Sequence, residues 1–234
     1  LLLPFLINSA LDNGLKEIYI ILDSKSTSDK DKAIWERRTE NRFGKFSAFN
    51  KSLFILKKFN VPFYFVENHN SEESIKLYKE LKLKCLFNAG TPRKICSKLL
   101  DLNNIPEGVI NIHPGKLPEY RGCSCVEWAI LNDDPIFNTV HYMDIEYDTG
   151  PIIKSMECRL NSNSNYVDIR SKVYLDGCKL SIEVLKSIQN NTFSKKDAKI
   201  QDNNKAKYWE PMPIKIEEDC ISKANNQKYK YQKS

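Results

Sequence analysis

The feature that most constrains the fold is a short apolar stretch that runs directly into polar and ring-bearing residues. Residues 108–110, Gly-Val-Ile, lead into the run Asn111-Ile112-His113-Pro114-Gly115. The β-branched residues predict a short buried strand, and Pro114, which cannot donate to a ladder, predicts its end. Side chains alternate along a strand, so Asn111 and His113 point the same way. The sequence therefore predicts an amide beside an imidazole at a strand's carboxyl end, where ligands bind in open α/β sheets.

A second polar turn lies downstream and gives the histidine a possible partner. A lone histidine is more often a satisfied core residue, and Asn111 alone fits a turn cap. However, Asp148 stands in a turn rich in Gly and Pro, residues 148–151, with Met143-Asp144 just before it. If Asp148 folds back against His113, the three side chains form an oxyanion donor, a proton acceptor and its orienter.

Several motifs in a fixed order then carry a family resemblance. Asn-x-His-Pro is followed by Leu-Pro-x-Tyr-Arg-Gly, then by Trp128-Ala129-Ile130, Met143-Asp144 and Asp148-Thr149-Gly150-Pro151-Ile152. This pattern resembles the folate-dependent formyltransferases, over roughly residues 85–155. That family includes glycinamide ribonucleotide transformylase, methionyl-tRNA formyltransferase and the sugar-nucleotide N-formyltransferases.

The resemblance implies an α/β fold with a Rossmann-like, mostly parallel sheet and helices on both faces. The family opens with a strand that becomes the central one, whereas residues 1–11, closed by Asn13-Gly14, fit the helix that follows it. We therefore expect the chain to lack that first strand. The alternative, a strand at residues 1–7, conflicts with Pro4.

Apolar periodicity and turn residues predict the other elements and the domain limits. Strands are expected at 17–22, 63–66, 84–89, 139–143 and 152–160, and helices at 45–59, 71–81, 93–100, 124–131 and 165–189. We expect a catalytic domain over residues 1–192 and a polar extension over 193–234, disordered from Lys223 onward.

The chemistry of formyl transfer assigns roles to the three central residues. An amine attacks the formyl carbon, so an oxyanion forms and the amine must lose a proton. Asn111 supplies an N–H to the oxyanion. His113 stabilises the oxyanion or takes the proton, and Asp148 fixes the tautomer of His113 or relays the proton through a water.

Binding residues follow from the resemblance. The helix start near Arg93 walls the pterin pocket in the family, whereas the alternative for its apolar residues is core packing. Tyr120 and Arg121 are candidates for holding the acceptor's phosphate or for bracing a loop, and His141 for a core or pocket-wall role. The residues expected at the folate are Arg93, Ile95, Leu100 and Met143.

Composition limits the cellular context. The net charge of +6 suits an anionic ligand without identifying it. Seven scattered cysteines indicate reduced thiols, Cys123 and Cys125 alone do not make a zinc site, and no metal is expected. No apolar run approaches the roughly 20 residues that span a bilayer, and no signal peptide is visible. We expect a cytoplasmic protein, with a homodimer as one option.

The resemblance names 10-formyltetrahydrofolate as the donor and a primary amine as the acceptor. Methionyl-tRNA formyltransferases carry an additional β-barrel, for which the residues after the long helix leave no room, so nucleic acid is disfavoured. An amino-sugar nucleotide is the favoured acceptor, with glycinamide ribonucleotide and methionyl-tRNA as alternatives. A different class, a folate- or RNA-binding module without catalysis, is the competing hypothesis.

Overall fold

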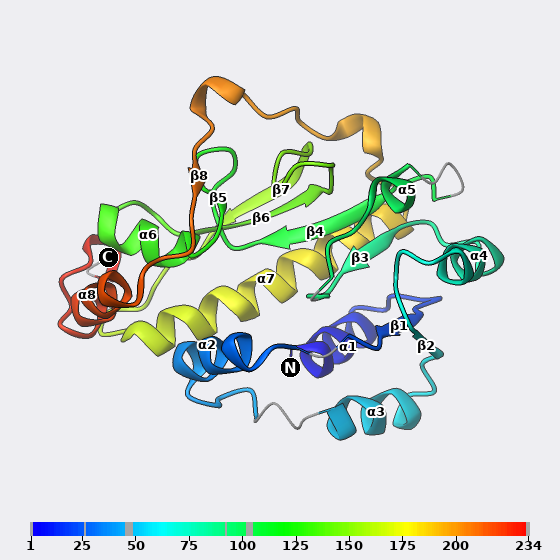
Figure 1. Ribbon diagram of the computed structural model, residues 1–234, viewed down its shortest axis with the longest axis horizontal. Helices are drawn as coiled ribbons and strands as arrows, with labels where there is room; N and C mark the ends of the chain where they lie inside the picture. The colour runs from blue at the N-terminus through cyan, green and yellow to red at the C-terminus, as the bar shows by residue number, and fades with distance from the viewer. Residues whose placement is uncertain (1, 26, 45–48, 92, 102–104, 233–234) are drawn as a thin grey trace.

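The computed structural model describes residues 2–25, 27–44, 49–91, 93–101 and 105–232, which form an α/β fold (Figure 1). The N-terminal elements are α1 (Leu3–Asp12), β1 (Ile20–Asp23), α2 (Asp29–Thr39), α3 (Phe49–Lys58), β2 (Phe63–Val66), α4 (Glu72–Glu80), β3 (Leu86–Asn88) and α5 (Ser97–Leu100). They are followed by β4 (Val109–His113), β5 (Arg121–Gly122), α6 (Cys125–Asn132), β6 (Phe137–Tyr142), β7 (Ile152–Glu157) and α7 (Tyr166–Gln189). After α7 come two short 3-10 turns, at Lys195–Asp197 and Asn203–Lys205. They are followed by β8 (Tyr208–Trp209), α8 (Ile214–Asn225) and a third 3-10 turn at Lys230–Gln232.

The largest sheet is mixed. Its order is β3-β4-β6-β7, with β3 parallel to β4 and with both β6 pairings antiparallel. The expectation of a mostly parallel sheet is therefore wrong for these four strands, because apolar periodicity locates strands without fixing their direction. In the described part of the chain, β1 and β2 pair in parallel with each other only. The missing first strand stays a prediction.

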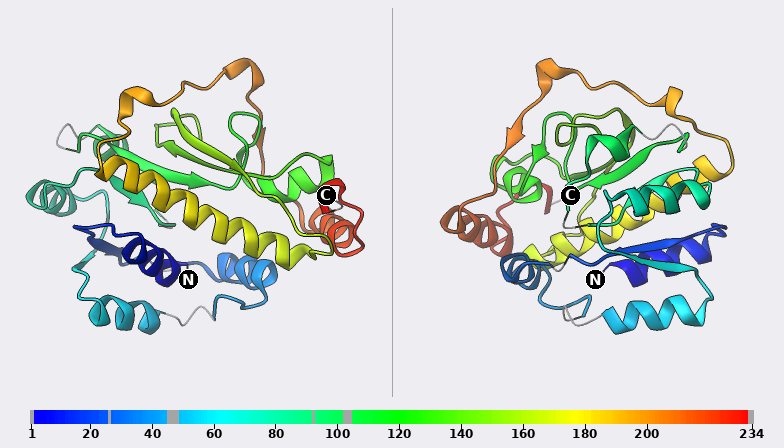
Figure 2. Two further views of the ribbon diagram at one scale, coloured as in Figure 1. Left: turned by 180° about the vertical axis from the view of Figure 1, so that it is seen from behind. Right: turned by 45° about the vertical axis from the view of Figure 1, so that its right-hand side comes forward.

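Helix α7 is the central support of the sheet. Asn165 and Asp168 form a reciprocal capping box at its start, which satisfies backbone N–H groups that the first turn leaves free. One side of α7 packs against β4, β6 and β7, and another side packs against α1 and α2 (Figure 2). Leu180, Val184 and Ile188 meet Ile110 beneath the sheet in one apolar cluster. This cluster fixes β4, and so the direction in which its polar end points.

The segment after α7 is folded. It runs along the β7 edge of the sheet as a strap (residues 190–207), with Lys199 bridged to Ile152, and leads to β8, which pairs in parallel with β5 (Figure 1). Helix α8 then packs against α6, and Cys220, Ala224 and Tyr229 are fully buried there. The expectation of disorder from Lys223 onward is wrong, because its lysines lie among buried residues that carry the packing.

Most expected elements are found with shifted ends. The first strand begins only at Ile20, since Glu17 has a left-handed φ of 53°. The helix expected at 93–100 is shorter, spanning Ser97–Leu100. Residues 45–48 of the helix expected at 45–59 lie outside the described residues. None of the described helices combines the length and apolar character needed to cross a membrane.

Candidate active site

The first group of the site is the Asn111 amide, in the middle of β4. The parallel register sets Asn88 beside Asn111, and Asn88 Nδ2 donates to Asn111 Oδ1 at 3.0 Å. This contact distinguishes the two ends of the Asn111 amide and turns its nitrogen toward β6. There Asn111 Nδ2 lies 3.2 Å from Nε2 of His141, the residue that the antiparallel register sets opposite it. Strand β4 therefore presents an oriented N–H donor.

His141 has one committed nitrogen and one adaptable nitrogen. Its Nδ1 lies 2.7 Å from the Tyr142 carbonyl, which can only accept, so Nδ1 carries a proton. In the neutral ring, Nε2 is then an acceptor for Asn111. The same Nε2 lies 3.5 Å from Asp148 Oδ1, toward which it can donate once protonated. From the sequence we expected only a core or pocket-wall role for His141, because the cross-strand register is not visible there.

His113 lies behind the carboxylate. It is 4% exposed, its Nε2 lies 2.6 Å from the Tyr120 carbonyl, and its Nδ1 lies 3.4 Å from Asp148 Oδ2. Burial lowers the pKa of His113 below its ordinary value, and the Asp148 charge counters only part of this shift. A Cβ on Gly115 would come within 2.5 Å of His113 Nε2, so only glycine fits there.

Asp148 joins the two imidazoles. Its Oδ2 accepts from the Gly122 backbone N–H at 2.9 Å. Burial alone would raise the pKa of Asp148, but the nearby His141 and His113 rings and the Gly122 N–H outweigh it and lower this pKa. Asp148 also has a left-handed φ of 58°, a conformation that a non-glycine residue adopts at a cost. The expected approach of Asp148 to His113 is thus found in the geometry.

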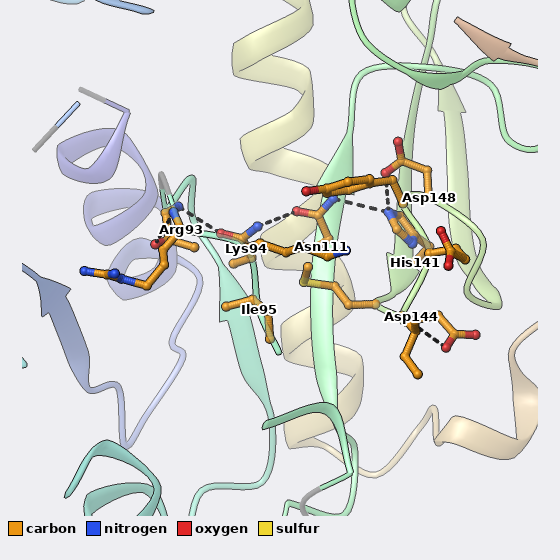
Figure 3. A pocket seen from close by; sticks show the side chains of 13 residues that line it. Arg93, Lys94, Ile95, Asn111, His141, Asp144 and Asp148 are labelled. Carbon is orange, nitrogen blue, oxygen red and sulfur yellow. Dashed lines mark hydrogen bonds and ion pairs between the residues drawn. The ribbon is translucent and has the colours of Figure 1, made fainter. Parts of the chain in front are cut away.

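A pocket of about 260 Å³ opens beside this cluster. Asn111, His141 and Asp148 line one part of it (Figure 3). Of the expected folate residues, Arg93, Ile95 and Met143 line it as well.

The Arg93 guanidinium itself points away from Asn111 (Figure 3). It forms an ion pair with Asp23 at 2.8 Å, at the end of β1. Any contact of Arg93 with a ligand in the pocket therefore falls to its backbone and to the stem of its side chain.

Four of the predicted residues do not line this pocket. His113 is one of them and reaches it only through Asp148. Leu100 packs with Ile95 and Met143 in an apolar cluster behind the pocket wall.

The two candidates for phosphate binding have internal partners. Tyr120 donates to Asp134 at 2.6 Å. Arg121 donates to Gln201 and Asn203. These contacts fit the loop-bracing alternative that the sequence left open.

Comparison with known proteins decides the family. The sequence model of the formyl transferase family matches residues 8–185, which is more than half of the chain. The chain belongs to this family. The match includes the whole pocket, whereas the strap after Gln189, β8 and α8 lie outside it.

Curated proteins that resemble this chain include methionyl-tRNA formyltransferases. The protein of Borrelia duttonii is 40% identical over 138 residues, which is 57% of this chain and 42% of that protein. The protein of Buchnera aphidicola subsp. Baizongia pistaciae is 33% identical over 156 residues, which is 57% of this chain and 46% of that protein. The chain thus spans less than half the length of these relatives.

Solved structures share the fold at lower identity. The formyltransferase PseJ from Anoxybacillus kamchatkensis, solved with UDP-4,6-dideoxy-4-formamido-L-AltNAc and tetrahydrofolate, has a TM-score of 0.56 at 17% identity. That comparison covers 92% of this chain and 94% of PseJ. Phosphoribosylglycinamide formyltransferase from Streptococcus pneumoniae has a TM-score of 0.51 at 21% identity, covering 73% of this chain and 98% of that chain.

Proposed function

We propose that this formyl transferase moves a formyl group from 10-formyltetrahydrofolate to a primary amine, and that the amine belongs to an amino-sugar nucleotide. The observation that carries the proposal is the convergence of Asn111, His141 and Asp148 on one pocket, with His113 behind the carboxylate. A neutral N–H donor and a carboxylate paired with imidazoles are what acyl transfer to an amine requires.

The steps balance without a covalent enzyme intermediate. The amine nitrogen attacks the formyl carbon, and the carbonyl oxygen becomes an oxyanion that accepts from Asn111 Nδ2. The cationic nitrogen passes a proton to the cluster of Asp148, His141 and His113. In this cluster His141 Nε2 and His113 Nδ1 lie 3.5 and 3.4 Å from the two carboxylate oxygens. The bond from the formyl carbon to the folate nitrogen then breaks, and that nitrogen takes up a proton.

Each catalytic residue has a limited role in this scheme. Asn111 and Asp148 reach the reacting atoms from the pocket wall. His113, whose Nε2 is committed to Tyr120, acts through Asp148. Ile95, Met143 and the backbone near Arg93 hold the flat pterin of the donor, and Leu100 supports that wall from behind.

The proposed identity of the acceptor rests on how much of the chain the solved structures match. The PseJ comparison covers 92% of this chain and 94% of PseJ, whereas the comparison with the phosphoribosylglycinamide formyltransferase covers only 73% of this chain. This favours an amino-sugar nucleotide. Methionyl-tRNA is the second candidate, because the curated relatives at 33–40% identity act on it by name.

A panel assay tests both acceptors. Purified protein is given 10-formyltetrahydrofolate with UDP- and dTDP-linked amino sugars, glycinamide ribonucleotide or methionyl initiator tRNA. Formation of tetrahydrofolate and a product heavier by the mass of CO are measured together. We expect an amino-sugar nucleotide to be formylated, and Asp148→Asn to abolish this. If tRNA alone is formylated, the second candidate holds. If no amine is formylated and the protein binds only folate or RNA, the catalytic proposal fails.

A further inference from the structure

One side chain from outside the family match reaches the turn that carries Asp148. The strap, residues 190–207, connects α7 to β8 along the β7 edge of the sheet (Figure 1). Gln201 is the buried side chain of this strap, 7% exposed. Its Nε2 donates to the Asp148 carbonyl at 2.8 Å and to the Gly150 carbonyl at 2.7 Å. The strap therefore contacts the backbone of the candidate catalytic turn directly.

The Gln201 amide is held in one orientation. Its Oε1 accepts from Arg121 Nε at 3.0 Å and from an Arg121 Nη at 2.8 Å. A guanidinium can only donate and a carbonyl can only accept, so a flipped amide would face like groups on both sides. Arg121 is itself 9% exposed and also donates to Asn203 at 2.9 Å. Arg121 and Gln201 thus form a rigid link from β5 to the turn.

The turn needs such a link because its backbone is unfavourable and tightly placed. Asp148 is left-handed at φ 58°, and a non-glycine residue stays there only where its surroundings hold it. A Cβ on Gly150 would come within 2.0 Å of the Tyr142 carbonyl, so the turn lies directly against β6. Gln201 holds the carbonyl side of Asp148, while the Gly122 N–H holds its carboxylate.

We propose that Gln201, oriented by Arg121, is a positioning residue that fixes the Asp148 carboxylate between His113 and His141. The catalytic use of that carboxylate rests on the proposed function, but its position does not. The charge of Asp148 also acts on Arg121, Cys123, Cys125 and Tyr208, and it raises the pKa of each. Losing the link changes the distance of the carboxylate from the two histidines first, because both lie within 3.5 Å of it.

Gln201→Glu tests the link with little change of shape. It keeps an oxygen for Arg121 but replaces the N–H donors with an oxygen that faces two carbonyls. The chain has three histidines, so a two-bond 1H–15N spectrum of histidine-labelled protein resolves each ring. We expect the ring nitrogens of His113 and His141 to shift, while those of His69, at the end of β2, stay unchanged.

Activity gives the second measurement. A displaced carboxylate lowers kcat by about 10- to 100-fold, since misplacement of about 1 Å costs up to that much. KM for the folate donor is expected to stay within about twofold, because Gln201 does not line the pocket. A purely structural role would instead lower the melting temperature and leave the kcat of the folded protein unchanged.

Gln227→Glu is the matched control. Gln227 also donates from Nε2 to a backbone carbonyl, that of Ser164, but it lies beyond α8. We expect it to shift none of the three histidines. Gln201→Met, which removes the donors without adding charge, repeats the test if Gln201→Glu does not fold.

Two outcomes overturn the proposal. One is His113 and His141 signals that superimpose on those of the wild type in both Gln201 variants. The other is a wild-type kcat in a folded Gln201 variant. If the wild-type protein formylates no acceptor, the histidine spectra still decide the role of Gln201, so the two proposals fail separately.

Discussion

Two clusters of buried ionisable groups have different surroundings. The Asp148 cluster, with His113 and His141, borders the pocket, and its carboxylate is partly accessible at 13%. The ion-pair cluster consists of Glu127 on α6, Arg170 on α7, Arg38 on α2 and Glu217 on α8. Glu127 is fully buried there, and none of these four residues lines the pocket.

The pairing in the two clusters also differs. Glu127 Oε1 lies 3.2 Å from Arg38 Nε and 3.6 Å from Arg170 Nε, and it accepts from the Tyr166 hydroxyl at 2.7 Å. Burial would raise the pKa of Glu127, but Arg170 and Arg38 outweigh it and lower this pKa. Fixed charges of opposite sign hold four helices together. In the Asp148 cluster the partners are imidazoles, which carry a charge only when protonated, whereas a guanidinium is always charged. A shifted pKa alone therefore does not locate a site. What distinguishes the Asp148 cluster is that its carboxylate is accessible from the pocket and is paired with imidazoles.

The largest expected effect breaks the ion-pair cluster. Glu127→Gln leaves Arg170 buried without a negative partner, and such a loss costs about 3–5 kcal/mol. Urea unfolding is expected to show this loss of stability. Activity per folded molecule is expected to stay unchanged, because Glu127 lies away from the pocket. A stable Glu127→Gln protein with reduced kcat would contradict the division between the two clusters.

The next largest effect is expected from removing the N–H donor beside the Asp148 cluster. Asn111→Ala is expected to lower kcat by about 10²–10³-fold, the usual cost of one oxyanion donor, with little change in melting temperature. Asn132→Ala is the control. It also removes an amide donor, which binds the Tyr120 hydroxyl at the end of α6, but Asn132 does not line the pocket. Asn111→Ala with near wild-type turnover would exclude Asn111 as the oxyanion donor.

The elements whose periodicity is strong could be predicted from the sequence. The long helix at 165–189 and the strand at 63–66 agree with the structure almost residue for residue. The C-terminal segment could not be predicted, because its many lysines make its composition polar although Cys220, Ala224 and Tyr229 are fully buried. Sequence composition averages over the two faces of a helix, whereas packing uses only one.

The site was predictable where side-chain alternation sufficed and not where pairing decided. Alternation along β4 and the Gly-rich turn led to Asn111, His113 and Asp148. His141 and Gln201 could not be assigned, because their contacts depend on the β4–β6 register and on a separation of 53 residues between Gln201 and Asp148. Arg121 was predicted to bind the acceptor or brace a loop, and its contacts with Gln201 and Asn203 in the structure favour the second role.

The two clusters should also respond to acid in different pH ranges. His113 has a pKa below its ordinary 6.5, so the unfolded chain binds that proton more readily. Its contribution to stability is complete above pH 6.5 and is lost as pH falls through the folded pKa. Glu127, with a pKa below its ordinary 4.5, loses its contribution only below that pH.

Melting temperatures from pH 7 to 4 measure this separation. His113→Gln is expected to lessen the decline that begins near pH 6.5, and Glu127→Gln the decline below about pH 4.5. His69, whose pKa is also lowered by burial, shares the first range, so His69→Gln shows its part. An unchanged profile in His113→Gln would mean that the pKa of His113 does not differ between the folded and unfolded states as inferred.

The smallest effect tests whether burial or pairing gives the ion-pair cluster its importance. Arg42 pairs with Asp168 near the start of α7, but the two side chains are 39% and 37% exposed. Exposed pairs are worth about 0–1 kcal/mol because water screens them and ordering the side chains costs entropy. Arg42→Ala should therefore lower the free energy of unfolding by about 1 kcal/mol or less, with the difference shrinking in high salt. A loss as large as that of Glu127→Gln would show that pairing with α7, rather than burial, controls stability at this end of the helix.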